Sequence, residues 1–454
     1  MRYEKYKQTG IPWLPEVPEG WTWVRLSVLG SLSNGLSKDG GSFGKGYPFV
    51  SYGDVYRNTS LPSNVKGLVQ SSAAERLSCS VLRGDVLFTR TSESIEAIGF
   101  SSTCLSDIQA ATFAGFLIRF RPRTGDLLPE YSKYYFRNSR LREFFRLRIP
   151  GIITRASLSQ NVLRDLPTVL PPLPEQRAIV AYLDDKCGKI DELVAAKEKE
   201  VGLLKELKQT VIADAVTRGI SHAETAELAE GVSSPRSLRS LRENNRRLVP
   251  SGIPWLPLIP EGWEVRRLGA YFTDDVVANK DFKYNRAFKF NYGQLIPKNE
   301  IGEPEDYRDV YVKYSVLKEG DIVLNGLNLN YDFISQRVAE SPSDGIITSA
   351  YLVCRPKAGV FSKYFTFLFK AMDFKKMFHG MGTGIRLTLS FSELKKQMLP
   401  VPPLDEQRAI VAYIEEKTAK IDQAVAGLAQ QVAALKEYKQ RLIADVVTGQ
   451  MRVA

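Results

Sequence analysis

Histidine, cysteine and long apolar runs are scarce in this chain of 454 residues. Its four cysteines lie far apart without a CxxC pair, and it has only two histidines, which argues against disulfides and against a metal site. No stretch approaches the ~20 apolar residues that a membrane span needs. The first residues also lack the apolar segment of a signal peptide. We therefore expect a cytoplasmic protein without a bound metal.

Signature motifs of catalysis are missing as well. The sequence contains no GxxxxGK[ST] phosphate loop, no HExxH, no GxSxG, and no GxGxxG that opens a helix after a strand. The residues Glu415-Glu416-Lys417 have the ExK spacing of many nucleases, but they lie in a heptad helix where chance explains them. We therefore expect no catalytic residue in this chain.

The chain has length and positive charge in abundance. It is about three times as long as a typical domain of ~150 residues, and 44% of its residues are hydrophobic, as in globular proteins. The net charge is +11, and nearly all of the surplus falls in residues 1–165 and 248–400. This charge suits a polyanion such as double-stranded DNA, although an ordinary basic protein is the alternative.

An internal repeat is the strongest signal in the sequence. Residues 10–21 (GIPWLPEVPEGW) and 252–263 (GIPWLPLIPEGW) are identical at all but two positions. Residues 171–186 (PPLPEQRAIVAYLDDK) match 402–417 (PPLDEQRAIVAYIEEK) in the same way, at all but four positions. The residues between these motifs agree only in scattered places. Each half of the chain therefore joins a variable block to a near-constant one.

The variable blocks predict mixed globules, because short β-type runs alternate with Gly and Pro and each block closes with an aromatic helix. The near-constant blocks predict long helices that begin after Pro172 and Pro403 and end at Gly219 and Gly449. Apolar residues recur at heptad spacing in both helices. The predicted helix–helix seam comprises Leu183, Ile190, Val194, Leu204, Val211, Ile414, Ile421, Leu428, Leu435 and Leu442.

These patterns predict an α+β protein in which two globules are joined by two long antiparallel coiled-coil helices under a pseudo-two-fold duplication. The alternative is that each helix packs on its own globule. The predicted parts are a first globule (1–165), a first helix (166–219), a polar linker (220–247), a second globule (248–400) and a second helix (401–454). The linker ends in an arginine cluster, which is either solvated or in contact with DNA phosphates.

Candidate DNA-binding residues are basic or amide side chains in the loops and helices of the globules. Arginine pairs well with guanine and asparagine with adenine, although asparagine also forms ordinary turns. Two of the arginines occupy Gly-containing loops at the same offset in the repeat, where they contact either a backbone phosphate or a structural carboxylate. The candidates are Lys38, Lys45, Arg90, Arg140, Arg155, Asn325, Asn328, Asn330, Lys370 and Arg386.

The two motif pairs and the repetition of the whole unit resemble the specificity (S) subunit of type I restriction-modification enzymes. The resemblance implies two target recognition domains that each read one half of a split, asymmetric DNA sequence, and helices that set the gap. It also implies two modification subunits, which use S-adenosylmethionine, and restriction subunits, which use ATP and Mg²⁺ in phage defence. This chain itself would then hold no cofactor and catalyse nothing.

Partner helices have a possible docking surface in apolar residues outside the seam. Ile179, Ile212, Ile410 and Ile443 either contact the modification subunits or pack within this chain. Two other classes of function stay open on the residues alone. They are a coiled-coil scaffold without DNA binding and a free-standing nuclease.

Overall fold

The computed structural model describes residues 2–92, 98–149, 156–220, 247–299, 302–329, 336–382 and 387–453. The chain forms two compact units, which we call unit 1 (Met1–Glu198 with Gln430–Ala454) and unit 2 (Lys199–Ala429). Each unit combines one globule with a segment of each long helix. Among the described helices, none combines the length and the apolar character that crossing a bilayer requires.

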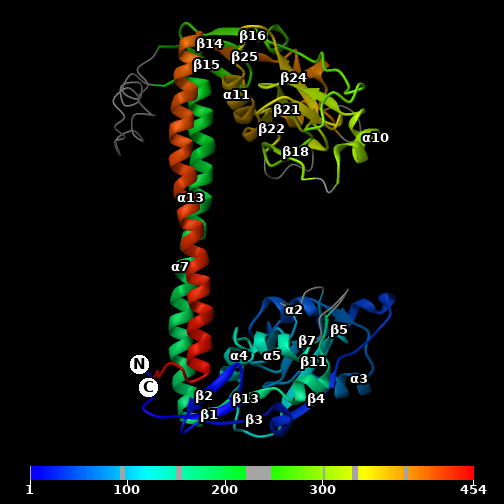
Figure 1. The fold of residues 1–454 in the computed structure, drawn as a ribbon, viewed down its shortest axis with the longest axis vertical. Helices are drawn as coiled ribbons and strands as arrows, with labels where there is room; N and C mark the ends of the chain where they lie inside the picture. Colours follow the sequence, from blue (N-terminus) through cyan, green and yellow to red (C-terminus); the bar gives the residue numbers. More distant parts are fainter. Residues whose placement is uncertain are drawn as a thin grey trace. The chain divides into compact units, whose positions relative to one another are not determined.

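The two long helices, α7 (Leu173–Arg218) and α13 (Leu404–Val447), run antiparallel and lie side by side within each unit (Figure 1). In unit 1, the ammonium of Lys439 on α13 lies 2.6 Å from a carboxylate oxygen of Asp191 on α7. In unit 2, Lys208 on α7 lies 2.7 Å from Asp422 on α13. From the first pair to the second, the residue number rises on α7 and falls on α13. This order confirms the predicted antiparallel pairing of the two helices.

The helix ends follow the punctuation of the sequence. Both helices begin directly after a Pro-Pro pair, because proline has no N–H to donate and its ring clashes with the preceding turn. Both helices are followed by a glycine with positive φ, which is +72° at Gly219 and +74° at Gly449. A side chain with a Cβ atom is disfavoured in that left-handed conformation, so glycine ends the helix at low cost.

The seam residues pack inside the units that contain them. Leu183, Ile190, Val194 and Leu442 are buried in unit 1 and Val211, Ile414 and Ile421 in unit 2, while Leu204, Leu428 and Leu435 are half-buried. The four isoleucines outside the seam also turn inward. Ile179, Ile212 and Ile410 are buried and Ile443 is half-buried in the same cores. These four residues therefore pack within the chain and do not form a docking surface.

Unit 1 is built around a four-stranded antiparallel sheet in the order β4-β11-β7-β9. Its strands are β4 (Gly30–Asn34), β7 (Val86–Thr89), β9 (Ser101–Thr103) and β11 (Leu117–Pro122). Smaller pairings join β1 (Tyr6–Ile11) to β2 (Leu14–Pro18), β3 (Thr22–Arg25) to β13 (Pro167–Leu170), β8 (Thr91–Ser92) to β12 (Ala156–Ser157), and β5 (Phe43–Val50) to β6 (Leu68–Val69) and β10 (Thr112–Phe113). The short helices are α1 (Leu26–Leu29), α2 (Tyr52–Arg57), α3 (Ala73–Ser78), α4 (Pro129–Tyr135), α5 (Leu141–Arg148) and α6 (Gln160–Arg164), with a 3-10 turn at Gly40–Ser42.

Unit 2 repeats this plan with a sheet in the order β17-β24-β21-β22. Its strands are β17 (Phe272–Thr273), β21 (Ile322–Leu324), β22 (Val338–Glu340) and β24 (Leu352–Pro356). Further pairings join β14 (Leu248–Ile253) to β15 (Leu256–Pro260), β16 (Glu264–Arg267) to β25 (Met398–Val401), β18 (Phe288–Asn291) to β19 (Gln294–Pro297), and β20 (Ser315–Leu317) to β23 (Gly345–Ile347). The helices are α10 (Arg308–Tyr311), α11 (Ser362–Phe374) and α12 (Phe391–Leu394), with 3-10 turns at Leu268–Ala270, Pro304–Tyr307 and Met377–Met381.

A buried ion pair recurs at the same place in both central sheets. Asp85, before β7, accepts hydrogen bonds from the Arg121 guanidinium at 2.7 Å and 2.6 Å. Asp321, before β21, accepts them from Arg355 at 3.2 Å and 2.8 Å. Both carboxylates are almost fully buried. Gly84-Asp85 and Gly320-Asp321 thus occupy equivalent turns, and the carboxylate of each turn joins two neighbouring strands.

Each globule also holds the end of the long helix that belongs to the other half of the sequence. In unit 1, the Tyr131 hydroxyl donates to the Val447 carbonyl at 3.1 Å. In unit 2, the Tyr364 hydroxyl lies 3.2 Å from the Val216 carbonyl. Both tyrosines are fully buried, so their hydroxyls meet carbonyls that the last turn of a helix leaves without an internal partner.

Candidate nucleic-acid interface

Several of the candidate residues gather at one end of each central sheet, where β7 finishes in unit 1 and β21 finishes in unit 2. Arg90 directly follows β7, and its backbone N–H donates to the Phe116 carbonyl at 2.9 Å. Asn325 directly follows β21, and its N–H donates to the Arg337 carbonyl at 2.9 Å. Because the strands are antiparallel, the start of the neighbouring strand lies at this same end. We call this region the loop end of each sheet.

The loop end of unit 1 presents an exposed aromatic ring beside basic residues. Phe116, just before β11, is 59% exposed. Arg90 is half-buried beside it. Lys38 lies in the loop after β4, and its ammonium pairs with Glu75 at 2.6 Å. Hydrogen bonds from Lys38 and from the backbone of Ser72 lower the pKa of Glu75 to about 2.

The loop end of unit 2 is held in place by a buried arginine. The Arg337 guanidinium donates to the carbonyls of Asn325 and Leu327 at 2.8 Å and to that of Asn328 at 3.2 Å. Its own backbone N–H donates to Asp373 on α11 at 2.8 Å. Asn328 adopts a left-handed conformation with φ +49°, which asparagine tolerates better than most residues. The buried Arg337 side chain therefore holds the loop that carries Asn325 and Asn328.

Unit 1 also has two arginines that hold a loop in place, Arg137 just after α4 and Arg142 on α5. Arg137 donates to the Ser101 carbonyl at 2.8 Å, and Arg142 donates to the Gly99 carbonyl at 2.8 Å. Both guanidinium groups lie over the Phe100 ring, with distances to its centroid of 4.4 Å and 4.5 Å. Burial lowers the pKa of Arg142 to about 10. These arginines fix the segment that leads into β9.

Sequence reasoning missed Arg337 and Phe116. Arg337 precedes a short strand and looks like any exposed charge in the sequence, whereas in the structure its side chain is only 8% exposed. Phe116 lies in an apolar run that reads as a strand, and that pattern does not predict its exposure. The sole local signal is Gly115 before it, a residue that favours turns.

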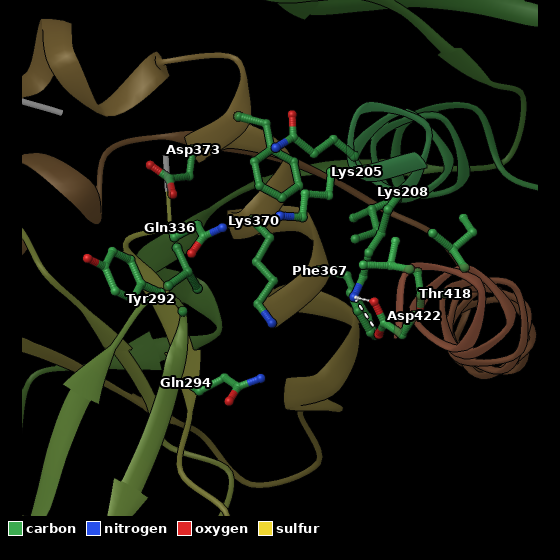
Figure 2. Close-up of a pocket in the computed structure, with 17 residues that line it drawn as sticks. Lys205, Lys208, Tyr292, Gln294, Gln336, Phe367, Lys370, Asp373, Thr418 and Asp422 are labelled. Atoms are coloured by element: carbon green, nitrogen blue, oxygen red, sulfur yellow. Dashed lines mark hydrogen bonds and ion pairs between the residues drawn. The ribbon is translucent and has the colours of Figure 1, made fainter. Parts of the chain in front are cut away.

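The remaining candidates are placed as follows. Lys45 is exposed in β5. Arg140, directly before α5, forms an ion pair with Asp445 on α13 at 2.6 Å and so connects α5 to the long helix. Lys370 projects from α11 into a cavity of unit 2 (Figure 2). Arg155, Asn330 and Arg386 lie outside the described residues, as does most of the predicted linker. A contact between DNA and any of these residues stays a prediction.

The two loop ends offer groups that bind and recognise, and they carry different groups in the two units. Guanidinium, ammonium and amide donors suit base edges and phosphates. Within the described residues, no group of three His, Cys, Asp or Glu side chains is placed to hold a metal ion.

Comparisons with known proteins agree with this chemistry. The family model of the type I restriction modification DNA specificity domain matches residues 260–432. The chain is 22% identical to a putative type I restriction enzyme MjaX specificity subunit from Methanocaldococcus jannaschii, over 99% of this chain and 97% of that protein. It is 26% identical to the type I restriction enzyme EcoKI specificity subunit from Escherichia coli, over 48% of this chain and 47% of that protein.

A solved structure shares the fold over nearly the whole chain. It comes from a study of complex assembly and conformational transition of the type I R-M system, and it aligns with a TM-score of 0.61. The alignment covers 96% of this chain and 99% of the other at 16% identity. The family model, the full-length relative and the shared fold agree with the repeated motifs and with the two loop ends. This chain is similar in sequence and in fold to the specificity subunits of type I restriction-modification systems.

Proposed function

We propose that each globule of this subunit reads one half of a split DNA target. The observation that carries the proposal is that two sheets of the same strand order present different side chains at equivalent loop ends. Unit 1 offers Arg90 beside Phe116, whereas unit 2 offers Asn325 and Asn328. Different groups at equivalent positions select different bases, so the two halves of the target differ in sequence.

The long helices would set the gap between the half-sites. α7 and α13 are 46 and 44 residues long, and most of their heptad seam is buried. A helix advances about 1.5 Å per residue, so the length of the helices would translate into a distance between the half-sites. The number of unread base pairs would follow from that spacing.

The partners would be two modification subunits, which bind S-adenosylmethionine, together with restriction subunits that use ATP and Mg²⁺. A docking surface for one modification subunit lies on the helices of unit 1. Leu193 on α7 is 45% exposed and Tyr438 on α13 is 56% exposed. Tyr182 shares the α7 face with Leu193, since eleven residues make three helical turns. Burial raises the pKa of Tyr182, with a further contribution from the nearby Tyr438.

The test of split recognition is an exchange of one variable block, residues 22–165 or 264–398, for that of another specificity subunit. The hybrid is co-expressed with the modification subunit, and methylated sites are mapped by methylation-aware sequencing. We expect one half of the motif to change and the other to persist. A change in both halves would reject the model of two independent readers.

The docking surface is tested by Leu193→Glu together with Tyr438→Glu. A buried carboxylate would oppose an apolar contact, so the purified complex should hold one modification subunit instead of two. Leu77→Glu is the matched control, because Leu77 is 81% exposed on α3 of the same unit, away from the long helices. Two modification subunits in the double variant would refute the assignment.

A further inference from the structure

Unit 2 contains a cavity of about 470 Å³ between its globule and its long helices (Figure 2). The walls are α11, the turn between β18 and β19, Gln336 and Val338 at the start of β22, and the facing sides of α7 and α13. The polar side chains that line it include Lys205, Lys208, Gln294, Gln336 and Lys370. This lining is rich in hydrogen-bond donors, so the cavity is not a simple packing defect.

Lys370 projects into this cavity. It comes from the third turn of α11, and Figure 2 shows its ammonium between Gln294, Gln336 and the Phe367 ring. The ammonium lies 5.8 Å from the centroid of that ring. Among the described carboxylates, none lies within ion-pairing distance of it. Lys205 reaches toward the same space from α7 and is likewise without a described ion pair.

The carboxylates that line the cavity already have partners. Asp422 holds the Lys208 ammonium through two contacts of 2.7 Å. Asp373 accepts the Arg337 backbone N–H at 2.8 Å. Burial lowers the pKa of Lys370, the charge of Lys208 lowers it further, and the carboxylate of Glu340 partly opposes both. An entering anion would relieve both effects, because it would replace lost hydration and offset the repulsion between the lysines.

The cavity adjoins the loop end of the sheet. Gln336 lines the cavity, and the next residue, Arg337, holds the carbonyls of the Asn325–Asn328 loop. Asp373 of the cavity wall holds the Arg337 backbone in turn. A DNA strand that follows the loop would thus pass beside Lys370. Phosphate oxygens are the anions that such a strand presents in greatest number.

We propose that this cavity binds a phosphate group, with Lys370 and Lys205 as its cationic partners and Gln336 as an amide donor. The inference deepens the proposed function and rests on it. A phosphate could come from the backbone of the bound DNA or from a free phosphate compound. Ammonium groups bind either source as point charges, and the carboxamide adds a directed hydrogen bond.

The first arm of the test measures DNA binding at graded salt for the intact subunit with its modification partners. Lys370→Gln should lower the slope of log K against log salt by about one unit and leave the methylated motif unchanged, because one phosphate contact is lost. Lys375→Gln is the matched control. It removes the same charge from the end of the same helix, where the ammonium lies 5.9 Å from the Trp255 ring.

The second arm measures the thermal unfolding midpoint in inorganic phosphate against chloride at equal ionic strength. A midpoint raised by phosphate in the unaltered chain and in Lys375→Gln, but not in Lys370→Gln, would support a free phosphate as the source. A reduced salt slope would support the DNA backbone. Lys205→Gln, an exposed helical position, repeats both arms should Lys370→Gln fail to fold.

An unchanged salt slope together with an unchanged phosphate effect would overturn the inference. The proposed function fails separately. If the unaltered subunit with its modification partners bound no preferred DNA sequence, split recognition would be wrong whatever the lysine variants did.

Discussion

Removing the buried carboxylate of one central sheet should unfold that sheet's unit selectively. In Asp85, one carboxylate oxygen accepts the Arg121 Nε–H at 2.7 Å, and the other accepts the Nη2–H at 2.6 Å and the Leu82 N–H at 2.8 Å. Asp85→Asn keeps the size of the side chain. Whichever way its amide turns, however, an NH₂ group meets an N–H donor. The substitution therefore loses hydrogen bonds and leaves the guanidinium without a charge partner.

The cost follows from the burial of the pair. Asp85 is 1% exposed and the Arg121 side chain 28% exposed. Breaking a buried ion pair by removing one partner costs about 3–5 kcal/mol, and the partial exposure of Arg121 places the cost near the lower end, at about 3 kcal/mol. With a urea dependence of about 3 kcal/mol per molar, the unfolding midpoint of unit 1 should fall by about 1 M.

The measurement is hydrogen exchange of the intact chain in increasing urea, followed on peptides of β7 and β11 for unit 1 and of β21 and β24 for unit 2. Asp321→Asn should do in unit 2 what Asp85→Asn does in unit 1, since Arg355 holds it in the same way. Asp39→Asn, an exposed carboxylate in unit 1, is the control and should cost less than about 0.5 kcal/mol. A midpoint shift no larger than that of the control would refute the reasoning.

Three further predictions follow from other features. Tyr131→Phe and Tyr364→Phe should each lower the free energy of unfolding by about 1 kcal/mol, because each removes a hydroxyl that donates to a carbonyl at a helix end. We expect faster amide exchange in the last turn of α13 for the first variant and of α7 for the second, and unchanged exchange would contradict the prediction. Arg155→Ala and Arg386→Ala should each reduce the salt slope of DNA binding by about one unit without altering the preferred sequence, and unaltered slopes in both folded variants would leave these arginines a structural role. A seven-residue insertion between 196 and 203 should leave both half-sites intact and change the gap between them. A three-residue insertion rotates the following apolar stripe by roughly 60° and should therefore damage folding. An unchanged gap in the methylated motif of the seven-residue variant would show that the helices do not set the gap.

The sequence by itself determined the features that depend on local chemistry or on periodicity. The Pro-Pro pairs and the two glycines fixed where α7 and α13 begin and end, because their backbone restrictions act within one turn. The heptads predicted an apolar stripe that needs a partner helix, and α7 and α13 meet along it. The duplicated motifs predicted two related globules, and the two central sheets share one strand order.

Only the tertiary structure decided which charged and aromatic residues face inward at the loop ends. Arg337 and Arg142 resemble surface charges in the sequence, yet they bind carbonyls that the chain brings to them through folding. The four isoleucines outside the seam looked available to a partner, and the globules cover them. The Tyr131 hydroxyl donates to the carbonyl of Val447, which lies 316 residues later in the sequence. The physical reason is that burial and hydrogen-bond partners depend on segments remote in sequence, which no local pattern encodes.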